Sequence, residues 1–578
     1  MCGLVAVVGK KLPSLRKFKT AVELQNHRGP DNIKFLNLDN ALFGFCRLSI
    51  IDLSQKSNQP VKYKNITLML NGEIYNYIEL SQELKKYGFK FKSKGDSEVM
   101  AAAILFWGAE KAFKKARGMW AIVAYDNIEK KIIVSRDRLG IKPLWFFKNN
   151  DSLIFSSEIK SILHLFPEAK QINNNTLSKY LIDGELDTNY DSFFKKIFAF
   201  PRGSFISEKN KHINLDFKKY WSLKNGNKNK DFENSIKNEI DNTMKLHLRR
   251  DVKLGVALSG GLDSTLISYF TKSDKNIFYY SVLPPDAINE SENINQTVKQ
   301  WSLNHKYTDC KDVENLETID FIIKKMDQPF KSSKTLYQYA IRKQASRDGI
   351  KVFLTGDGAD EVFAGYSNCV IPYLSKFLIK GNFLTFIKKS YELQEFSETK
   401  PLKLCYLTFR NLFTRELLKR KNEPISKINL TLKGHLKYRL FEEGIPYWLR
   451  VEDAISMMNS LETRVPFLDH RLIEEAFNVN ESHFFENGFN KSLLRKICTF
   501  LPKHIVKPKI KLQRPGSTKR IIFDVLGNVA EECFRKDRLI ISKEDLQRFK
   551  VDKQNRKNAQ YWFRVLLALR WIEIFIKK

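Results

Sequence analysis

The sequence predicts a protein of two domains, an α+β domain followed by an α/β domain. Its 578 residues are more than one hydrophobic core usually organises. Several short segments in the first third of the chain alternate apolar and polar residues, as strands with one buried face do. Later in the chain, continuous apolar segments precede glycine-rich turns and amphipathic stretches. That is the pattern of a parallel sheet covered by helices.

Each expected strand follows one of these two patterns. In the first domain the strands are expected at Cys2–Val8, Leu68–Leu70, Ala121–Tyr125, Ile132–Ser135 and Leu144–Phe147. In the second they are a segment that contains Leu254, Val256 and Leu258, then Ile277–Leu283 and Lys351–Thr355. The polar segment Ser222–Asp231 is typical of a linker, and Phe232–Arg250 is expected to form an amphipathic helix.

Two glycine-rich acidic turns follow strands of the second domain. The first reads SGGLDS (Ser259–Ser264), and the second reads GDGADEVFAGY (Gly356–Tyr366). The carboxyl ends of parallel strands meet at one edge of a sheet, so both turns are expected to line one cleft. Glycines let the backbone approach a phosphate, and free N–H groups at a helix start face the anion. These turns therefore predict a nucleotide site, and their paired carboxylates suit Mg²⁺.

The composition is that of a soluble globular protein with a strong positive charge. Lys and Arg exceed Asp and Glu by 98 to 65, a net charge of +33. The lysines are spread along the chain and no RNA-binding motif is found, so we interpret the charge as compositional bias and expect no nucleic-acid partner. No apolar run approaches roughly 18 residues, so no membrane partner is expected. Seven scattered cysteines without a CxxC pair, and an N-terminus unlike a signal peptide, favour a cytoplasmic protein.

The second residue is a candidate nucleophile. Removal of Met1 would leave Cys2 with a free α-amino group beside its thiol. The amine, with a reference pKa near ~8, can accept the thiol proton, so one residue supplies both nucleophile and base. The alternative is a small buried cysteine in the first strand.

Motifs in the first hundred residues favour the nucleophile. They are HRGPD (His27–Asp31), RLSIID (Arg47–Asp52), NGEIYN (Asn71–Asn76) and GDSE (Gly95–Glu98). Their order resembles the class II glutamine amidotransferase domain, an N-terminal-nucleophile hydrolase. The resemblance continues through RDRLGIKPL (Arg136–Leu144) and SEIK (Ser157–Lys160). It implies an αββα sandwich of two stacked antiparallel sheets.

The chemistry of glutamine hydrolysis matches these residue types. Arg47 can hold the α-carboxylate of glutamine with a bidentate fork, and Asp96 can accept from its α-ammonium. Asn71 and the Gly72 N–H can form an oxyanion hole for the intermediate on Cys2. The resemblance thus implies a glutamine-binding set of Arg47, Ile51, Asn71, Gly72, Glu73 and Asp96.

The second half resembles a different enzyme domain. SGGLDS lacks the Gly-Lys-Ser/Thr ending of a Walker A loop and looks like the pyrophosphate loop of the ATP pyrophosphatases. Together with DQPF (Asp327–Phe330), TGDGADEVFAGY (Thr355–Tyr366) and ETRVPFLDH (Glu462–His470), it resembles the glutamine-dependent asparagine synthetases over nearly the full chain. This implies a parallel-sheet, HUP-like ATP pyrophosphatase domain with added helices. We expect the amidotransferase domain at 2–203, a linker at 204–231 and the synthetase domain at 232–578.

The resemblance also implies the second site and its substrates. ATP and Mg²⁺ are expected as co-substrate and metal, and glutamine and aspartate as the other small molecules. The expected ATP-binding residues are Leu258, Ser259, Gly260, Gly261, Asp263, Ser264, Tyr280, Thr355 and Gly356, with Asp263 and Asp360 on the metal. Asp357, where the family commonly has Glu, is expected to bind the acceptor. A catalytic lysine is expected at Lys509, with Lys511 as the second choice.

Several alternatives stay open. The acceptor is free aspartate or another carboxylate, such as a uronic acid of a surface polysaccharide. The β-lactam synthetases share the C-terminal motifs but lack a working N-terminal cysteine, which disfavours them. A basic nucleic-acid-binding protein would bind in a salt-sensitive way. The sequence leaves a homodimer open, as it does the role of 367–443.

Overall fold

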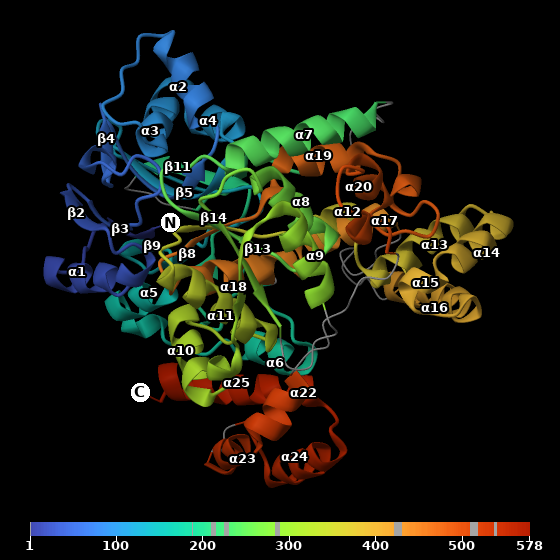
Figure 1. Cartoon of the computed structure of the whole chain (residues 1–578). Helices are drawn as coiled ribbons and strands as arrows, with labels where there is room; N and C mark the ends of the chain where they lie inside the picture. Colours follow the sequence, from blue (N-terminus) through green and yellow to red (C-terminus); the bar gives the residue numbers. More distant parts are fainter. Residues whose placement is uncertain are drawn as a thin grey trace.

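The computed structural model describes residues 2–187, 189–209, 215–224, 231–283, 290–420, 431–508, 518–536 and 540–577. Figure 1 shows the N-terminal strands and helices on one side and the helices α13–α16 on the opposite side. Among the helices of these residues, none is both long and apolar enough to cross a bilayer.

The N-terminal domain is built on two antiparallel sheets. One has the strand order β10-β8-β9-β1-β3-β2 and the other β12-β11-β7-β6-β5-β4. The strands are β1 (Gly3–Gly9), β2 (Asn32–Leu38), β3 (Ala41–Arg47), β4 (Val61–Tyr63), β5 (Ile66–Ile74), β6 (Gly118–Asp126), β7 (Lys131–Arg136), β8 (Trp145–Lys148), β9 (Ser152–Ser156), β10 (Phe198–Ala199), β11 (Ser204–Lys209) and β12 (Lys218–Lys219). Each expected strand overlaps one of these, since alternating apolar residues suit strands buried between layers.

Helices cover the outer faces of this sandwich. They are α1 (Leu15–Glu23), α2 (Tyr77–Lys85), α3 (Asp96–Trp107), α4 (Ala109–Lys115), α5 (Ile159–Leu165) and α6 (Asn174–Asp183). Helices α1 and α5 pack on the first sheet and α3 on the second. Between the sheets, Cys2, Phe45, Met69 and Val123 belong to one apolar layer. The αββα sandwich is therefore confirmed.

The first domain extends beyond residue 203. Strand β11 pairs with β7 from Phe205 to Lys209, and β12 pairs with β11. The segment expected to be a linker thus begins with two sheet strands, because Phe205 and Ile206 are buried against the sandwich. The described residue after the gap, Asp231, directly precedes α7 (Phe232–His247).

The C-terminal domain contains a five-stranded parallel sheet of order β15-β14-β13-β16-β17. These strands are β13 (Leu254–Ala257), β14 (Ile277–Val282), β15 (Asn304–Thr308), β16 (Val352–Leu354) and β17 (Glu462–Arg464). From the central strand β13, the chain first adds β14 on one side and later β16 on the other. Ligands of such sheets bind where the strand order reverses in this way, at the carboxyl ends.

The helices of this domain lie around the sheet and extend beyond it (Figure 1). Besides α7 they are α8 (Leu262–Thr271), α9 (Ser291–Trp301), α10 (Leu316–Met326), α11 (Lys334–Arg347), α12 (Ala359–Phe363), α13 (Val370–Ile379), α14 (Phe383–Glu392), α15 (Gln394–Ser397), α16 (Pro401–Arg420), α17 (Leu432–Phe441), α18 (Ile445–Met457), α19 (His470–Asn478), α20 (Ser492–Ile497), α21 (Lys503–Val506), α22 (Thr518–Arg520), α23 (Gly527–Lys536), α24 (Lys543–Asn555) and α25 (Ala559–Phe575).

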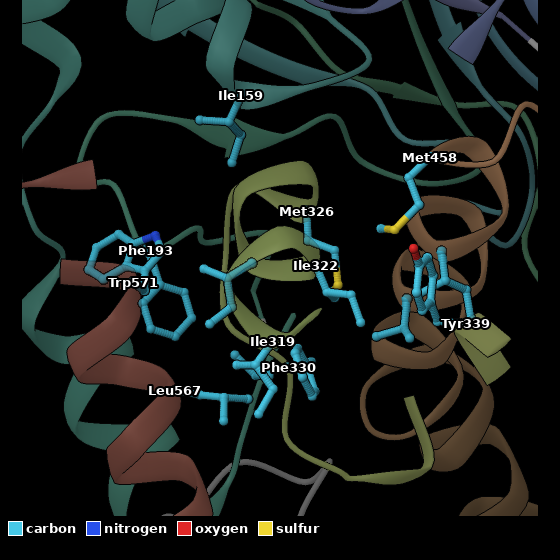
Figure 2. Packing of buried hydrophobic residues seen from close by; sticks show 14 of the residues in the cluster. Ile159, Phe193, Ile319, Ile322, Met326, Phe330, Tyr339, Met458, Leu567 and Trp571 are labelled. Carbon is cyan, nitrogen blue, oxygen red and sulfur yellow. The ribbon is translucent and has the colours of Figure 1, made fainter. Parts of the chain in front are cut away.

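The two domains share a hydrophobic core. Figure 2 shows Ile159 and Phe193 of the first domain facing α10 and α25 of the second. The rings of Phe193 and Trp571 lie 5.1 Å apart, and the Trp571 indole N–H donates to the Asp327 carbonyl at 3.0 Å. The last long helix of the chain is therefore part of the contact between the domains.

Candidate active sites

The candidate nucleophile lies at the start of β1, at the edge of the sandwich layer. The Cys2 backbone N–H donates to Asn71 Oδ1 at 3.0 Å, and its thiol lies 4.0 Å from the Leu48 carbonyl oxygen. Burial raises the pKa of the Cys2 thiol above its ordinary value. A protonated thiol needs a base before it can attack. Once Met1 is removed, the Cys2 nitrogen that bonds Asn71 is a free α-amine, and it can take the thiol proton.

The expected oxyanion hole is formed by neighbouring residues of β5. Asn71 Nδ2 donates one hydrogen to Ser157 Oγ at 3.3 Å, which leaves its second hydrogen for a ligand. Gly72 has φ +140°, and a Cβ there would stand 2.0 Å from the Met119 carbonyl oxygen. No other residue fits at this position without a backbone shift, so the close approach to β6 requires glycine.

Arg47, at the end of β3, is already engaged with the loop that follows it. Its Nη1 donates to the Ser54 carbonyl at 3.0 Å and to Asn58 Oδ1 at 2.8 Å. Its Nη2 donates to the carbonyls of Ile51 at 3.3 Å and Asp52 at 2.5 Å. These four bonds use all Nη hydrogens. A bidentate grip on a carboxylate therefore requires some of these carbonyls to release the guanidinium.

Two buried carboxyl groups lie on the ammonium side of the expected pocket. Asp96 begins α3, and its Oδ2 accepts from the Ile74 N–H at 2.8 Å. Burial raises the pKa of Asp96 to about 6. Burial, together with the nearby Glu462 and Asp96 carboxylates, raises the pKa of Glu73 well above its ordinary range. A cationic group that binds here would relieve the repulsion between these carboxylates.

The SGGLDS turn forms a compact loop between β13 and α8. Ser264 Oγ accepts from the Ser259 N–H at 3.1 Å and lies 3.0 Å from Ser259 Oγ. Gly260 has φ +72°, and Gly261 immediately precedes the first turn of α8. The first N–H groups of α8 have no helical partners, as at every helix start, and such groups after a glycine turn can bind phosphate.

The two acidic turns meet, as expected, and a lysine that sequence reasoning missed lies between them. Lys491 Nζ contacts both Asp263 oxygens, at 2.7 and 2.6 Å, and Asp360 Oδ1 at 2.6 Å. Burial alone would lower the pKa of Lys491, but the two carboxylates outweigh it and raise the pKa. Gly365 makes room for this lysine, because a Cβ there would lie 2.2 Å from Lys491 Cε. In the sequence, Lys491 stands in the segment NKSLLRK (Asn490–Lys496). Basic segments of this kind are common in the chain, so the sequence does not single out this lysine.

The second turn also positions the expected acceptor residue. Asp357 Oδ2 accepts from Thr355 Oγ1 at 2.6 Å, and Asp357 Oδ1 accepts from the Trp448 indole N–H at 2.9 Å. Both carboxylate oxygens are thus held by one hydrogen bond each. A Cβ on Gly356 would stand 3.0 Å from Asp263 Cβ, so the acceptor turn and the phosphate turn are in close contact.

Of the residues expected to contact adenosine, Leu258 lies beside the phosphate turn, whereas the Tyr280 side chain lies in the core. Leu258 follows β13, and its N–H donates to the Tyr280 carbonyl at 2.9 Å. The Tyr280 side chain is fully buried in the core and donates to Asp348 Oδ2 at 2.9 Å, so it does not face the turns. Lys509 and Lys511 lie outside the described residues.

A buried ionic network connects the two halves of the chain. Arg28 Nε donates to the Cys2 carbonyl at 3.0 Å, and its Nη2 lies 2.9 Å from Asp453 Oδ2 of α18. Arg28 Nη1 and His27 Nε2 both bond Glu158, at 3.3 and 2.9 Å. The first site thus touches the second domain through one side chain.

Lys160 extends this network. Its ammonium pairs with Glu158 and, at 3.1 Å, with Asp327. The motifs HRGPD, SEIK and DQPF therefore assemble at the domain interface.

Comparisons with known proteins agree with this division. The asparagine synthase family model matches residues 235–573, and the glutamine amidotransferase domain model matches residues 1–221. Asparagine synthetase [glutamine-hydrolyzing] 1 of Bacillus subtilis is 28% identical over the whole chain and 97% of its own length. Asparagine synthetase [glutamine-hydrolyzing] 2 of that species is 28% identical over 86% of this chain and 70% of its own.

An archaeal relative is slightly more similar over a shorter stretch. The putative asparagine synthetase [glutamine-hydrolyzing] 2 of Methanocaldococcus jannaschii is 30% identical over 66% of this chain and 78% of its own. With a family match over more than half of its residues, the chain belongs to the asparagine synthase family, the glutamine-hydrolysing ligases that carry an N-terminal glutamine amidotransferase domain.

Proposed function

We propose that this enzyme makes asparagine from aspartate, with glutamine as the nitrogen donor and ATP cleaved to AMP and pyrophosphate. The observation that supports it best is the pairing of a Cys2 pocket with the SGGLDS turn in one rigidly packed chain. Arg28 links the two domains, because it contacts the Cys2 carbonyl on one side and Asp453 of α18 on the other.

The first half-reaction takes place at Cys2. After removal of Met1, the α-amine beside Asn71 takes the thiol proton, and the sulfur attacks the amide carbon of glutamine. Asn71 Nδ2 and the Gly72 N–H stabilise the oxyanion. The amine returns the proton to the leaving nitrogen, ammonia departs, and water then hydrolyses the thioester to glutamate. Asp96 and Arg47 hold the two ends of the substrate.

The second half-reaction takes place above the parallel sheet. A β-carboxylate oxygen of aspartate attacks the α-phosphorus of ATP, the bond to the β-phosphate breaks, and pyrophosphate leaves into the SGGLDS turn. Ammonia then attacks the acyl carbon, and AMP leaves. Lys491 lies where a fixed cation can stabilise the charge on the phosphates.

Mg²⁺ fits the residues of this site. Asp263 and Asp360 both lie within 2.7 Å of one Lys491 Nζ, so their oxygens are close enough to share a cation. Magnesium is commonly held by one or two carboxylates plus the phosphates of its nucleotide. Asp263 and Asp360 would hold it, and it would neutralise charge on the departing pyrophosphate.

The test separates the two sites. We expect Cys2→Ala to abolish asparagine formation from glutamine and to retain it from ammonium salts, with Cys533→Ala, a half-buried cysteine far from the pocket in sequence, as the matched control. Products are identified by chromatography as AMP and pyrophosphate. Equal loss of both activities would give Cys2 a structural role. Formation of ADP would contradict the pyrophosphatase assignment, and turnover only with another carboxylate would contradict aspartate.

A further inference from the structure

Eight exposed apolar side chains lie on the two helices α14 and α16, away from both candidate sites. On α14 the side chains of Phe383, Leu384, Ile387 and Tyr391 are exposed, and on α16 those of Leu402, Tyr406, Phe409 and Phe413. All eight are between 49 and 84% exposed. Single exposed apolar residues are normal on proteins, but a contiguous set of this kind marks an interaction surface.

These residues form one stripe on each helix. The spacing on α16 is four, three and four residues, and that on α14 is mainly four, so each set follows one side of its helix. The helices pack antiparallel, since the Phe386 and Phe409 rings are 5.9 Å apart and Ser390 Oγ lies 3.7 Å from Cys405 Sγ. With about 100° per residue, both stripes then face the same side of the pair. We call these eight residues the apolar face.

Cations surround the apolar face. Between Val370 and Arg420 the chain has ten Lys and Arg residues against four Glu. Lys380, Lys388, Lys400, Lys403 and Arg410 are exposed. Among the described residues, none of these five forms an ion pair. Three of the glutamates, Glu392, Glu395 and Glu398, gather at the turn between the helices, and Lys389 pairs with one of them at 2.6 Å.

We propose that the apolar face docks on the surface of an anionic lipid bilayer. Helices that lie in a membrane interface combine Phe, Leu and Ile on one side with Lys and Arg beside it. Each basic residue near an anionic surface adds attraction. A second copy of the chain fits less well, because it would bring the same cations against these ones at a net charge of +33.

The position in the molecule suits such a contact. Figure 1 shows α13–α16 projecting on the side opposite the N-terminal domain. The apolar face can therefore lie on a surface while the glutamine pocket stays in water. The proposal extends the sequence-based expectation, which considered membrane spans alone, and it is independent of the proposed function.

Vesicle sedimentation tests the proposal with the full-length protein. Phosphatidylcholine vesicles with and without phosphatidylglycerol are compared at low and high salt. We expect binding to the anionic vesicles that weakens with salt. Leu384→Ser/Leu402→Ser should weaken it by roughly tenfold for each leucine that inserts. Lys388→Glu/Lys403→Glu should weaken binding at low salt only.

The control removes equally exposed apolar residues elsewhere. Ile128 and Ile182 are 73 and 71% exposed, and Ile128→Ser/Ile182→Ser should bind like the parent protein. The circular dichroism spectrum and thermal unfolding midpoint of every variant show that it is folded. Absence of binding to both vesicle types would overturn the proposal. So would concentration-dependent dimerisation that Leu384→Ser/Leu402→Ser abolishes, or tight binding of single-stranded oligonucleotides in place of vesicles.

Discussion

At the scale of single residues, the two candidate sites share one feature: each contains a charged group that is buried beside other charged groups. Asp96 is held by the Ile74 N–H and lies near Glu73, and Lys491 is held between Asp263 and Asp360. Burial makes an uncompensated charge costly, so a cation that binds beside Asp96 and Glu73 is held more strongly than it would be at the surface. The charge of Lys491 is already balanced by Asp263 and Asp360, which fix the position of its ammonium group.

The first prediction concerns the pH dependence of glutamine use. Burial raises the pKa of Asp96 to about 6, so the carboxyl is ionised above that pH and neutral below it. A neutral Asp96 cannot pair with the ammonium of glutamine. We expect kcat/KM for glutamine hydrolysis to fall roughly tenfold per pH unit below about 6, because this ratio reports the free enzyme.

Asp96→Asn is the control for that profile. It should bind glutamine weakly at every pH and show no inflection near pH 6. An unchanged inflection in this variant would assign the titration to another group, of which Glu73 is the nearest.

The second prediction concerns Lys491. Lys491→Met should slow AMP formation roughly 10²–10³-fold, the usual cost of removing one preorganised charge-stabilising group, and should leave glutamine hydrolysis intact. Lys496→Met, on the exposed side of α20, the helix that Lys491 directly precedes, is the matched control. Single-turnover AMP formation measures both. Normal turnover in Lys491→Met would return the role to Lys509, the lysine expected from the sequence.

The sequence could predict the first site better than the second. Cys2, Asn71, Gly72 and Asp96 each stand in a short motif of the first hundred residues, so the motifs mark them although Cys2 and Asn71 come from different sheets. Lys491 reaches Asp263 across 228 residues, and no pattern in the chain marks that contact. The assignment of Tyr280 to the adenosine stays a prediction for a related reason: an apolar strand shows that alternate residues are buried, and not which face meets the nucleotide.

At the scale of elements, most strands were predictable and the domain boundary was not. Strands β5, β6, β7 and β14 carry long apolar patterns that only a buried strand explains. Strand β11 follows the last amidotransferase motif and was therefore assigned to the linker, yet Phe205 and Ile206 bury it against the sandwich. A short strand such as β11 gains its place from the strands it pairs with, here β7 and β12, more than from its own sequence.

The third prediction concerns α25. Trp571 is fully buried and contacts Phe193 and Phe194 of the first domain. Trp571→Ala should lower the free energy of unfolding by about 3–5 kcal/mol, as for large aromatic residues removed from a packed core. Tyr87→Ala, which removes an exposed ring, should change it little. Urea denaturation of both variants gives the comparison, and equal midpoints would show that α25 does not hold the domains together.

At the scale of the whole molecule, the two domains behave as one folded body. A single apolar cluster includes Ile159 and Phe193 of the first domain and Met326 and Trp571 of the second (Figure 2). Buried charges cross the same boundary, since Lys160 pairs with Asp327 and Arg28 with Asp453. Separate motif sets in the sequence predict separate domains, but they give no measure of how much surface the domains share.

The fourth prediction follows from that shared surface. A fragment of residues 1–221, which is the extent of the amidotransferase match, should aggregate when expressed alone. It exposes Ile159, Phe193 and Phe194, and it leaves Arg28 without its partner Asp453. Size-exclusion chromatography of the fragment checks this. A monodisperse fragment with full glutaminase activity would show that the domain folds independently.

The contacts of Arg28 also limit which domains can be joined by recombination during evolution. Its guanidinium joins the backbone of Cys2, Glu158 of the same domain and Asp453 of the other. A recombination event that exchanged one half for that of a distant relative would have to bring matching charges on both sides, or leave a buried ion unpaired at a cost of several kcal/mol. We therefore expect the two domains to be inherited together, because recombination between distant relatives at the domain boundary would be selected against.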